Sequence, residues 1–109
     1  MVDITHKITT LRTAVAQAIV KVGSPKTIQA ILDKTVPKGD VLSVAKTAGL
    51  FAVKNTSNAI PDCHPMPIEF TGIEFECLTD SIQIEVTVKT IYKTGVEVEA
   101  MHGASIVAL

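Results

Sequence analysis

The sequence predicts an α+β domain in which helices cover an antiparallel β-sheet. Two patterns lead to this prediction. Apolar residues recur at helical spacing between residues 25 and 60, whereas apolar and polar residues alternate between residues 68 and 91. A last stretch, from residue 93 onward, is rich in small residues and is most simply a further helix. With 109 residues, the chain has the usual length of a single domain with one core.

The first segment, "TTLRTAVAQAIVKV", fits two descriptions. A helix would gather one apolar stripe, made of Leu11, Val15, Ala18 and Val22. A strand would alternate only roughly, because its apolar face would also carry Thr13 and Gln17. Periodicity alone therefore favours a helix in this segment.

Two helices with clear start signals are expected next. Ser24 can cap a helix that begins at Pro25, in the stretch "GSPKTIQAILDK". The breaker "TVPKGD" follows, and Asp40 can then cap a longer helix over residues 41–60. Gly49 lies inside that helix, where glycine costs about 1 kcal/mol relative to alanine. Its expected use is close packing against another helix.

The strongest pattern predicts a β-hairpin. Residues 68–78 and 81–91 flank a short "TD" turn. In the second of these runs, apolar positions alternate strictly with polar ones; the apolar set is Ile82, Ile84, Val86 and Val88. This period of two predicts strands with one buried face.

The amino-acid composition gives no support to a nucleic-acid-binding or membrane-spanning protein. The net charge is −1, tryptophan is absent and aromatic residues make up 4%, so nothing favours a nucleic-acid partner. The sequence has no apolar run of about 18 residues, so no membrane span is expected. The hydrophobic fraction of 47% exceeds what a small domain buries alone, which predicts an oligomer interface. A polar start and only two cysteines predict a cytoplasmic protein with reduced thiols.

The stretch "IPDCHPMP" places Cys63 and His64 in a backbone stiffened by three prolines. Histidine side chains in general exchange a proton near neutral pH, so a histidine at position 64 can donate a proton or bind a phosphate oxygen. The alternative is a turn histidine without a role. Adjacent Cys and His lack the usual zinc-ligand spacing. A metal site made of Cys63, His64, Cys77 and His102 is therefore a weak alternative, and a Cys63–Cys77 disulfide is not expected in the cytosol.

Charged residues mark three further places. Lys38 lies on the rigid turn "PKGD" before a helix start, where it can meet an anion or simply be solvated. Lys54, near the end of the long helix, is explained by the helix dipole. In "KTGVEVEA", Glu97 and Glu99 share a face if the chain is extended and diverge if it is helical. Together with Lys93 they can do acid–base work or hold a heterocycle, or they can be a charged first helical turn.

Three motifs in order, "PKGDVL", "AGLFAVKNTSNAIPDCHPMPI" and "KTGVEVEAMHGASIVAL", closely resemble the cyclic pyranopterin monophosphate synthase family, the molybdenum cofactor biosynthesis protein C family. The resemblance covers essentially the whole chain, including the opening "MVDITHK". It implies a ferredoxin-like core and a homohexamer, a trimer of dimers, with active sites at subunit interfaces. It also implies a strand at residues 12–22, against the periodicity, and we adopt the strand.

The implied activity is that of a lyase in molybdenum cofactor biosynthesis. Such enzymes convert (8S)-3',8-cyclo-7,8-dihydroguanosine 5'-triphosphate into cyclic pyranopterin monophosphate and release pyrophosphate. The resemblance implies no metal and no organic cofactor. The only partners expected are the small-molecule substrate and further copies of the chain.

The resemblance assigns site residues by position. Asp62, Cys63 and His64 match the family's first substrate-binding stretch, and Val98 and Glu99 match its second. Asp62 replaces a residue that is usually apolar, a tolerable change because the family uses backbone there. His64 is the expected partner of the triphosphate or of a reacting proton.

Two further residues receive roles from the resemblance. Lys38 matches a lysine that reaches the site from a neighbouring subunit, where it would neutralise the phosphates as pyrophosphate leaves. Glu97, together with Glu99, would hold the guanine-derived ring, because a carboxylate pairs well with adjacent N–H donors. Lys38 and His64 are thus the candidate catalytic residues.

The end of the sequence departs from the family. Members continue past "IVAL" into a segment resembling "T-x-YDM-x-K", which carries the catalytic aspartate and an essential lysine. The aspartate would fall four residues beyond Leu109, and the last helix shows none of the usual stop signals. We therefore expect a single synthase domain over residues 1–109 that is truncated and inactive alone. The alternative is a non-catalytic shortened homologue that binds a nucleotide or a partner.

Overall fold

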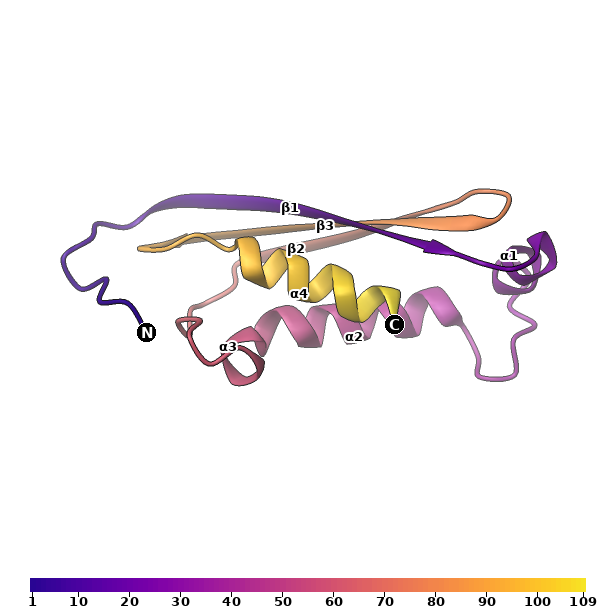
Figure 1. The fold of residues 1–109 in the computed structure, drawn as a ribbon, viewed down its shortest axis with the longest axis horizontal. Coiled ribbons are helices and arrows are strands. Elements are labelled where there is room, and N and C mark those ends of the chain that lie inside the picture. Colours follow the sequence, from indigo (N-terminus) through magenta and orange to yellow (C-terminus); the bar gives the residue numbers. More distant parts are fainter.

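The computed structural model describes all residues from 1 to 109, and it has the predicted α+β architecture (Figure 1). Three strands form one sheet, and helices lie along one of its faces. The elements in chain order are β1 (Thr10–Lys21), α1 (Pro25–Leu32), α2 (Val41–Lys54), α3 (Thr56–Ala59), β2 (Phe70–Cys77), β3 (Ser81–Tyr92) and α4 (Glu97–Ala108).

The sheet has the strand order β1-β3-β2 and is antiparallel throughout. Strand β1 pairs with β3 over its full length, from Thr10 opposite Tyr92 to Lys21 opposite Ser81. The strand implied by the family resemblance is therefore confirmed, and the helix favoured by periodicity is wrong. Small residues explain the difference, because alanines at alternate positions of β1 form the side that the helices cover, and these are Ala14, Ala16 and Ala18.

The predicted hairpin is confirmed. Strands β2 and β3 pair from Phe70 opposite Lys89 to Cys77 opposite Ile82. The turn between them is closed by Leu78, whose backbone N–H donates to the carbonyl of Ser81 at 2.8 Å. The alternating apolar residues of β3 all point into the core, where Val86 and Val88 have no exposed surface.

The predicted helix caps are confirmed, but the long helix is shorter than expected. The Oγ of Ser24 accepts from Lys26 N at 3.2 Å, and the Oδ1 of Asp40 accepts from Ser43 N at 3.2 Å. The helix expected over residues 41–60 ends at Lys54, and the short α3 follows after Asn55.

Side-chain hydrogen bonds to the backbone explain this break. Asn55 leaves helical geometry, with φ −112° and ψ 16°, and its amide nitrogen donates to the carbonyl of Phe51 at 2.9 Å. The hydroxyl of Thr56 contacts the carbonyls of Ala52 and Val53. Such local side-chain bonds offer the backbone an alternative to continued helix. They redirect the chain toward the loop that carries His64.

Helices α2 and α4 pack tightly against each other and against the sheet. A Cβ at Gly49 would overlap the side chain of Val107 and approach that of Ile73 within 2.8 Å. A Cβ at Gly103 on α4 would lie 2.6 Å from Val53. The expected use of Gly49 in close helix packing is thus confirmed, and Gly103 has the same use on the facing helix.

The second face of the sheet has no helix on it (Figure 1). Large apolar side chains of β1 are exposed there, and Leu11, Val15 and Ile19 are 69%, 59% and 54% exposed. Ile91 and Phe70 of the neighbouring strands are about as exposed. This surface is the excess apolar area expected from the composition. None of the helices is both long and apolar enough to cross a membrane.

Candidate active site

The proline-rich loop that follows α3 brings His64 to the first turn of α4. A small cavity forms there, and we call it the His64–Glu99 cavity. The polar side chains of its lining come from the end of α2, from α3, from the loop and from the start of α4. Its apolar side chains come from the end of α2 and from the loop that leads into β2. Its lining consists of Val53, Lys54, Thr56, Ser57, His64, Met66, Ile68 and Glu99. The cavity therefore joins two residues of the predicted site with a cation that ends α2.

Glu99 is the buried acid of this cavity, with only 3% of its surface exposed. Burial raises the pKa of its carboxyl, and the charge of Glu97 raises it further. A hydrogen bond from its own backbone N–H and the nearby His102 act in the opposite direction. Glu99 is thus a carboxyl group whose protonation state is set by its surroundings, as is common for a group that holds a ligand or moves a proton.

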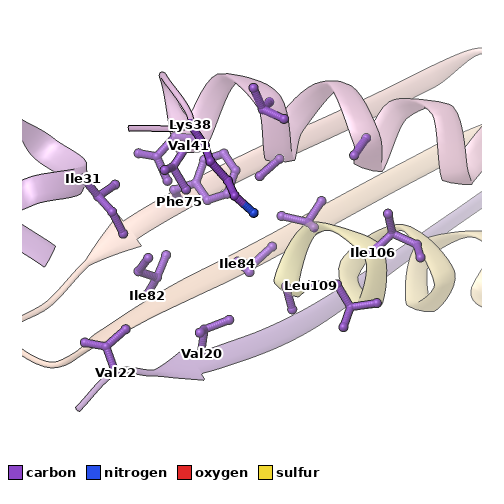
Figure 2. Close-up of a pocket in the computed structure, with 16 residues that line it drawn as sticks. Val20, Val22, Ile31, Lys38, Val41, Phe75, Ile82, Ile84, Ile106 and Leu109 are labelled. Carbon is purple, nitrogen blue, oxygen red and sulfur yellow. The ribbon is translucent and has the colours of Figure 1, made fainter. Parts of the chain in front are cut away.

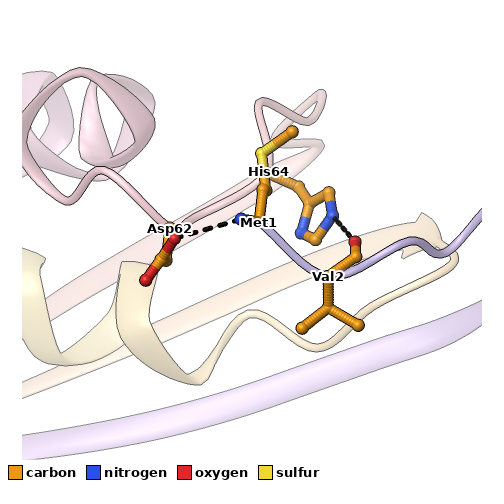
Figure 3. Close-up of polar contacts among 4 residues, drawn as sticks. All are labelled: Met1, Val2, Asp62 and His64. Carbon is orange, nitrogen blue, oxygen red and sulfur yellow. Dashed lines mark hydrogen bonds and ion pairs between the residues drawn. The ribbon is translucent and has the colours of Figure 1, made fainter.

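His64 is held by the N-terminal segment (Figure 3). Its Nε2 lies 2.7 Å from the carbonyl oxygen of Val2. Because a carbonyl only accepts, Nε2 carries the hydrogen and Nδ1 is the nitrogen free to accept. The α-ammonium group of Met1 meets Asp62 Oδ1 at 3.2 Å, and the side chain of Asp62 is 91% exposed. Residues 1 and 2 therefore lie across the loop that carries the first predicted binding stretch.

Cys63 carries a free, half-buried thiol. Burial raises its pKa first, and the charges of Glu99 and Asp62 raise it further. A thiol in such surroundings stays protonated at neutral pH, which suits neither a nucleophile nor a metal ligand. Cys77 is also free and lies on β2, and no three Cys, His, Asp or Glu side chains gather as a metal site would require. The alternative zinc site thus finds no support in the geometry.

The two acids of the "KTGVEVEA" motif lie on different sides of α4. Glu97 is the first helical residue and is exposed, whereas Glu99 is buried two residues later. Val98 between them is half-buried. Successive helical residues point in different directions, so the helical alternative, in which the two carboxylates diverge, is the one that the structure adopts. Within one chain Glu99 alone enters the cavity.

Lys38 lies at the other end of α2 from the His64–Glu99 cavity. It precedes Val41, where the helix begins, while Lys54 at the end of the helix lines the cavity. At about 1.5 Å per residue, the helix separates these ends by roughly 20 Å. One chain therefore does not bring Lys38 to His64 and Glu99.

Lys38 lines a separate apolar groove of about 380 Å³ (Figure 2). Fifteen of the 16 lining residues are hydrophobic, and the amino group of Lys38 points into the space between them. Phe75, Ile84 and Leu109 are among the apolar residues around it. Neither of the two ion pairs of the structure involves Lys38. This cation is therefore available to a ligand.

Comparison with known proteins agrees with the motifs. The model of the MoaC family matches residues 1–109. The chain belongs to this family. A cyclic pyranopterin monophosphate synthase of Clostridium perfringens (strain SM101) is 48% identical over 111 residues, which span the whole chain and 70% of that relative. A protein of the same name from Geotalea uraniireducens is 49% identical, with 69% of it covered. A probable synthase from Sulfurisphaera tokodaii is 45% identical, with 72% covered.

The MoaC family resemblance read from the motifs is thereby confirmed. The relatives are longer than the part of them that matches this chain, since about 70% of their length is covered. The matched part contains every motif on which the resemblance was based. Residues of the predicted site therefore lie within a region that this chain shares with its relatives from end to end.

Sequence reasoning missed Thr56 as a member of the site region in this MoaC family chain, and it considered His102 only as a ligand of the alternative metal site. Thr56 is fully buried and lines the cavity, and its Oγ1 lies 3.1 Å from the Nδ1 of His102 on α4. His102 comes three residues after Glu99, which places both on one side of a helix. That spacing was visible in the sequence. The contact with Thr56 was not, because it depends on how α3 folds back after Asn55.

Arg12 is a further residue that the sequence did not single out. It is the only charged side chain on the helix-covered side of the sheet, and its Nε is buried without a hydrogen-bond partner. One of its terminal nitrogens donates to the carbonyl of Lys93 at 3.4 Å. A buried guanidinium that is only partly satisfied attracts an acceptor strongly. Arg12 and Lys93 thus add positive charge near the start of α4.

Proposed function

We propose that this MoaC family protein acts in molybdenum cofactor biosynthesis as a cyclic pyranopterin monophosphate synthase. Its substrate is (8S)-3',8-cyclo-7,8-dihydroguanosine 5'-triphosphate, and its products are cyclic pyranopterin monophosphate and pyrophosphate. The observation that carries this proposal is the joint position of His64 and Glu99 in one cavity, within a chain that is 45–49% identical to proteins with this name. No metal or organic cofactor has a role in this proposal.

Glu99 is the group that recognises the guanine-derived ring. When charged, its carboxylate can accept two hydrogen bonds from adjacent ring N–H groups, and its burial strengthens them. The neighbouring backbone of Val98 and of the loop at Asp62 and Cys63 completes the binding surface. Glu97 lies outside the cavity of its own chain, and its charge raises the pKa of Glu99, so it opposes the charged form of that carboxyl group.

His64 and Lys38 act on the other end of the substrate. His64 presents one donor and one acceptor nitrogen, which suits a phosphate oxygen or a proton in transit. To engage a substrate through Nε2, it must release the carbonyl of Val2, so the N-terminal segment moves when substrate binds. Lys38 neutralises the phosphates where pyrophosphate leaves.

The site is built from two subunits of a homo-oligomer, a hexamer arranged as a trimer of dimers. The support is the separation of roughly 20 Å between the two ends of α2, which keeps Lys38 away from the cavity of its own chain. A neighbouring chain can bring its Lys38 end to that cavity. The exposed apolar side chains of the open sheet face are further surface that an oligomer would bury.

The test compares two samples incubated with the cyclic dihydroguanosine triphosphate. One is the 109-residue chain, and the other is a chimera in which the C-terminal residues of the Clostridium perfringens relative follow Leu109. We expect both to bind the substrate and the chimera alone to form cyclic pyranopterin monophosphate, measured by mass spectrometry. Binding without product in the chimera would instead indicate the non-catalytic homologue. Absence of binding by both samples would refute the proposal.

A further inference from the structure

Thr56 and His102 form a polar contact between α3 and α4 beside the His64–Glu99 cavity. The Oγ1 of Thr56 lies 3.1 Å from His102 Nδ1 and 3.2 Å from each of two carbonyl oxygens, those of Ala52 and Val53. Thr56 is 2% exposed, so these partners make up the polar surroundings of its hydroxyl. No role in ligand binding has so far been given to either side chain.

Counting hydrogens assigns the tautomer of His102. A hydroxyl carries one hydrogen, and carbonyl oxygens only accept. If Thr56 gave its hydrogen to His102 Nδ1, its oxygen would face two carbonyl oxygens at 3.2 Å with no hydrogen between them. If the ring carries the hydrogen at Nδ1, the hydroxyl donates to a carbonyl and accepts from the ring. The second arrangement satisfies every contact, and it leaves Nε2 as the ring nitrogen with a free lone pair.

His102 is electrostatically coupled to Glu99. The two residues are three positions apart on α4, so their side chains are neighbours on the helix surface. Burial raises the pKa of Glu99, and His102 opposes that effect. A proton gained at His102 Nε2 leaves the Thr56 contact intact and places a positive charge beside the carboxyl group. Such coupling is reciprocal, so each group shifts the other equally.

We propose that His102, fixed by Thr56, is a positioning residue that keeps the carboxylate of Glu99 charged and ready to accept hydrogen bonds from the ring of the ligand. The identity of that ligand rests on the proposed function. The coupling itself is a property of the free chain. A protonated carboxyl group would offer a donor where the ring also has donors, so the charged form is the one that recognises the ring.

Other titratable groups face the same region, and the experiment has to separate them from His102. Glu97 on α4 disfavours a charge on Glu99, while Arg12 is the only charged group from the covered side of the sheet. The end of α2 and the loop contribute Lys54, Asp62, Cys63 and His64. Glu69, before β2, and Lys93, before α4, are further charged residues on the flanking segments. None of these groups hydrogen-bonds to His102, so replacing His102 leaves their contacts in place.

The test is a nuclear magnetic resonance titration of the 109-residue chain and two variants. His102→Asn keeps an N–H close to the position of Nδ1, so it preserves the donor to Thr56, but it does not titrate. Glu99→Gln keeps the shape of the carboxyl group without its charge. We expect His102→Asn to raise the pKa of Glu99. Glu99→Gln identifies which carboxyl signal belongs to Glu99. The exposed His6 is the internal reference and should not shift.

Two further measurements separate positioning from a purely structural role. Thr56→Val removes the hydroxyl group at constant shape. We expect the nitrogen-15 chemical shifts of the His102 ring to show that the tautomer with hydrogen on Nδ1 is no longer preferred. His102→Asn should also weaken binding of the cyclic dihydroguanosine triphosphate by about two- to tenfold, the range for one weakened hydrogen bond.

The outcomes distinguish this inference from the proposed function. An unchanged pKa of Glu99 in His102→Asn overturns the inference and leaves the proposed function standing. A raised pKa of Glu99 in His102→Asn, together with absence of substrate binding by both the chain and the chimera, supports the coupling and overturns the proposed function. Because His102→Asn keeps the donor to Thr56 and reports the pKa of Glu99 by itself, the failure of Thr56→Val to fold would not remove the test.

Discussion

The two ends of helix α2 have opposite surroundings. At its C-terminal end lies a small polar cavity with a buried carboxyl group and two histidines nearby, His64 and His102. At its N-terminal end lies a larger apolar groove in which Lys38 is the only charged residue. The Lys38 side chain is exposed and takes part in neither ion pair, so its ammonium group can meet an anionic ligand at this groove. One end is therefore suited to a nitrogen-rich ring, and the other to phosphate.

This difference is the basis of the proposal that two chains share one site. A nucleoside triphosphate needs both kinds of surroundings within the length of one molecule, yet the rigid helix holds them roughly 20 Å apart. Gly49, midway along α2, allows the helix to pack closely on α4, so the core fixes the position of the helix. The proposal that two chains share a site follows from this rigidity.

The largest expected effect is on catalysis. In the chimera extended beyond Leu109, Lys38→Ala and His64→Ala should each reduce product formation by about a hundredfold or more, as loss of one charge-stabilising group does in other enzymes. Neither change removes core packing, so the oligomer should remain intact by light scattering. Wild-type rates in either variant would remove that residue from the site. Lys26→Ala, an exposed lysine on α1, is the matched control and should change little.

The next effect is on protein stability, through the packing of α2, which joins the two ends, against α4. Gly49→Ala adds a Cβ that overlaps Val107 and crowds Ile73, and overpacking of this kind costs about 1–3 kcal/mol. We expect a lower free energy of unfolding in chemical denaturation, despite the better helix propensity of alanine. Gly23→Ala is the control, because nothing lies within 4 Å of its Cβ position. Equal stability of both variants would show that α2 and α4 are not held this closely.

The smallest effect is on the pH dependence of stability, and it concerns the carboxyl group of Glu99 at the C-terminal end of α2. Burial raises the pKa of Glu99 above that of an unfolded chain, so the unfolded state releases its proton first as pH rises. The wild-type free energy of unfolding should therefore fall as pH rises above about 4, by about 1.4 kcal/mol for each unit of the shift. Glu99→Gln should lose this dependence and be more stable at pH 7.

The control for this prediction is Glu76→Gln, on the open sheet face, where the carboxyl group is exposed. Its stability curve should follow that of the wild type. If Glu99→Gln also follows the wild type from pH 4 to pH 8, the carboxyl of Glu99 is not perturbed by burial.

The sequence predicted much of this architecture because its local signals agree with the fold. The caps at Ser24 and Asp40 and the strict alternation of β3 each predicted an element that the structure contains. Strand β1 could not be settled by periodicity, because its covered face is made of alanines, which fit helix and strand equally. The break at Asn55 was missed because side-chain hydrogen bonds to the backbone decide it.

For the site, the motifs predicted His64 and Glu99, and the structure brings these two together. The relation of Glu97 to Glu99 was left open, since it depended on whether the segment was helical. Thr56 could not be predicted, because its contact with His102 joins segments 46 residues apart in the sequence. The distance of Lys38 from the cavity likewise follows from the folded position of α2 and from no local pattern.

The most direct test of a site shared between two subunits is complementation between inactive variants. The Lys38→Ala and His64→Ala forms of the chimera are mixed in equal amounts, unfolded and refolded together so that subunits exchange. Some sites then combine Lys38 from one chain with His64 from the other. Random assembly predicts recovery of roughly a quarter of wild-type product formation. Activity that stays at the level of the separate variants, in oligomers shown to be mixed, would place both residues in the same chain's site and contradict the account.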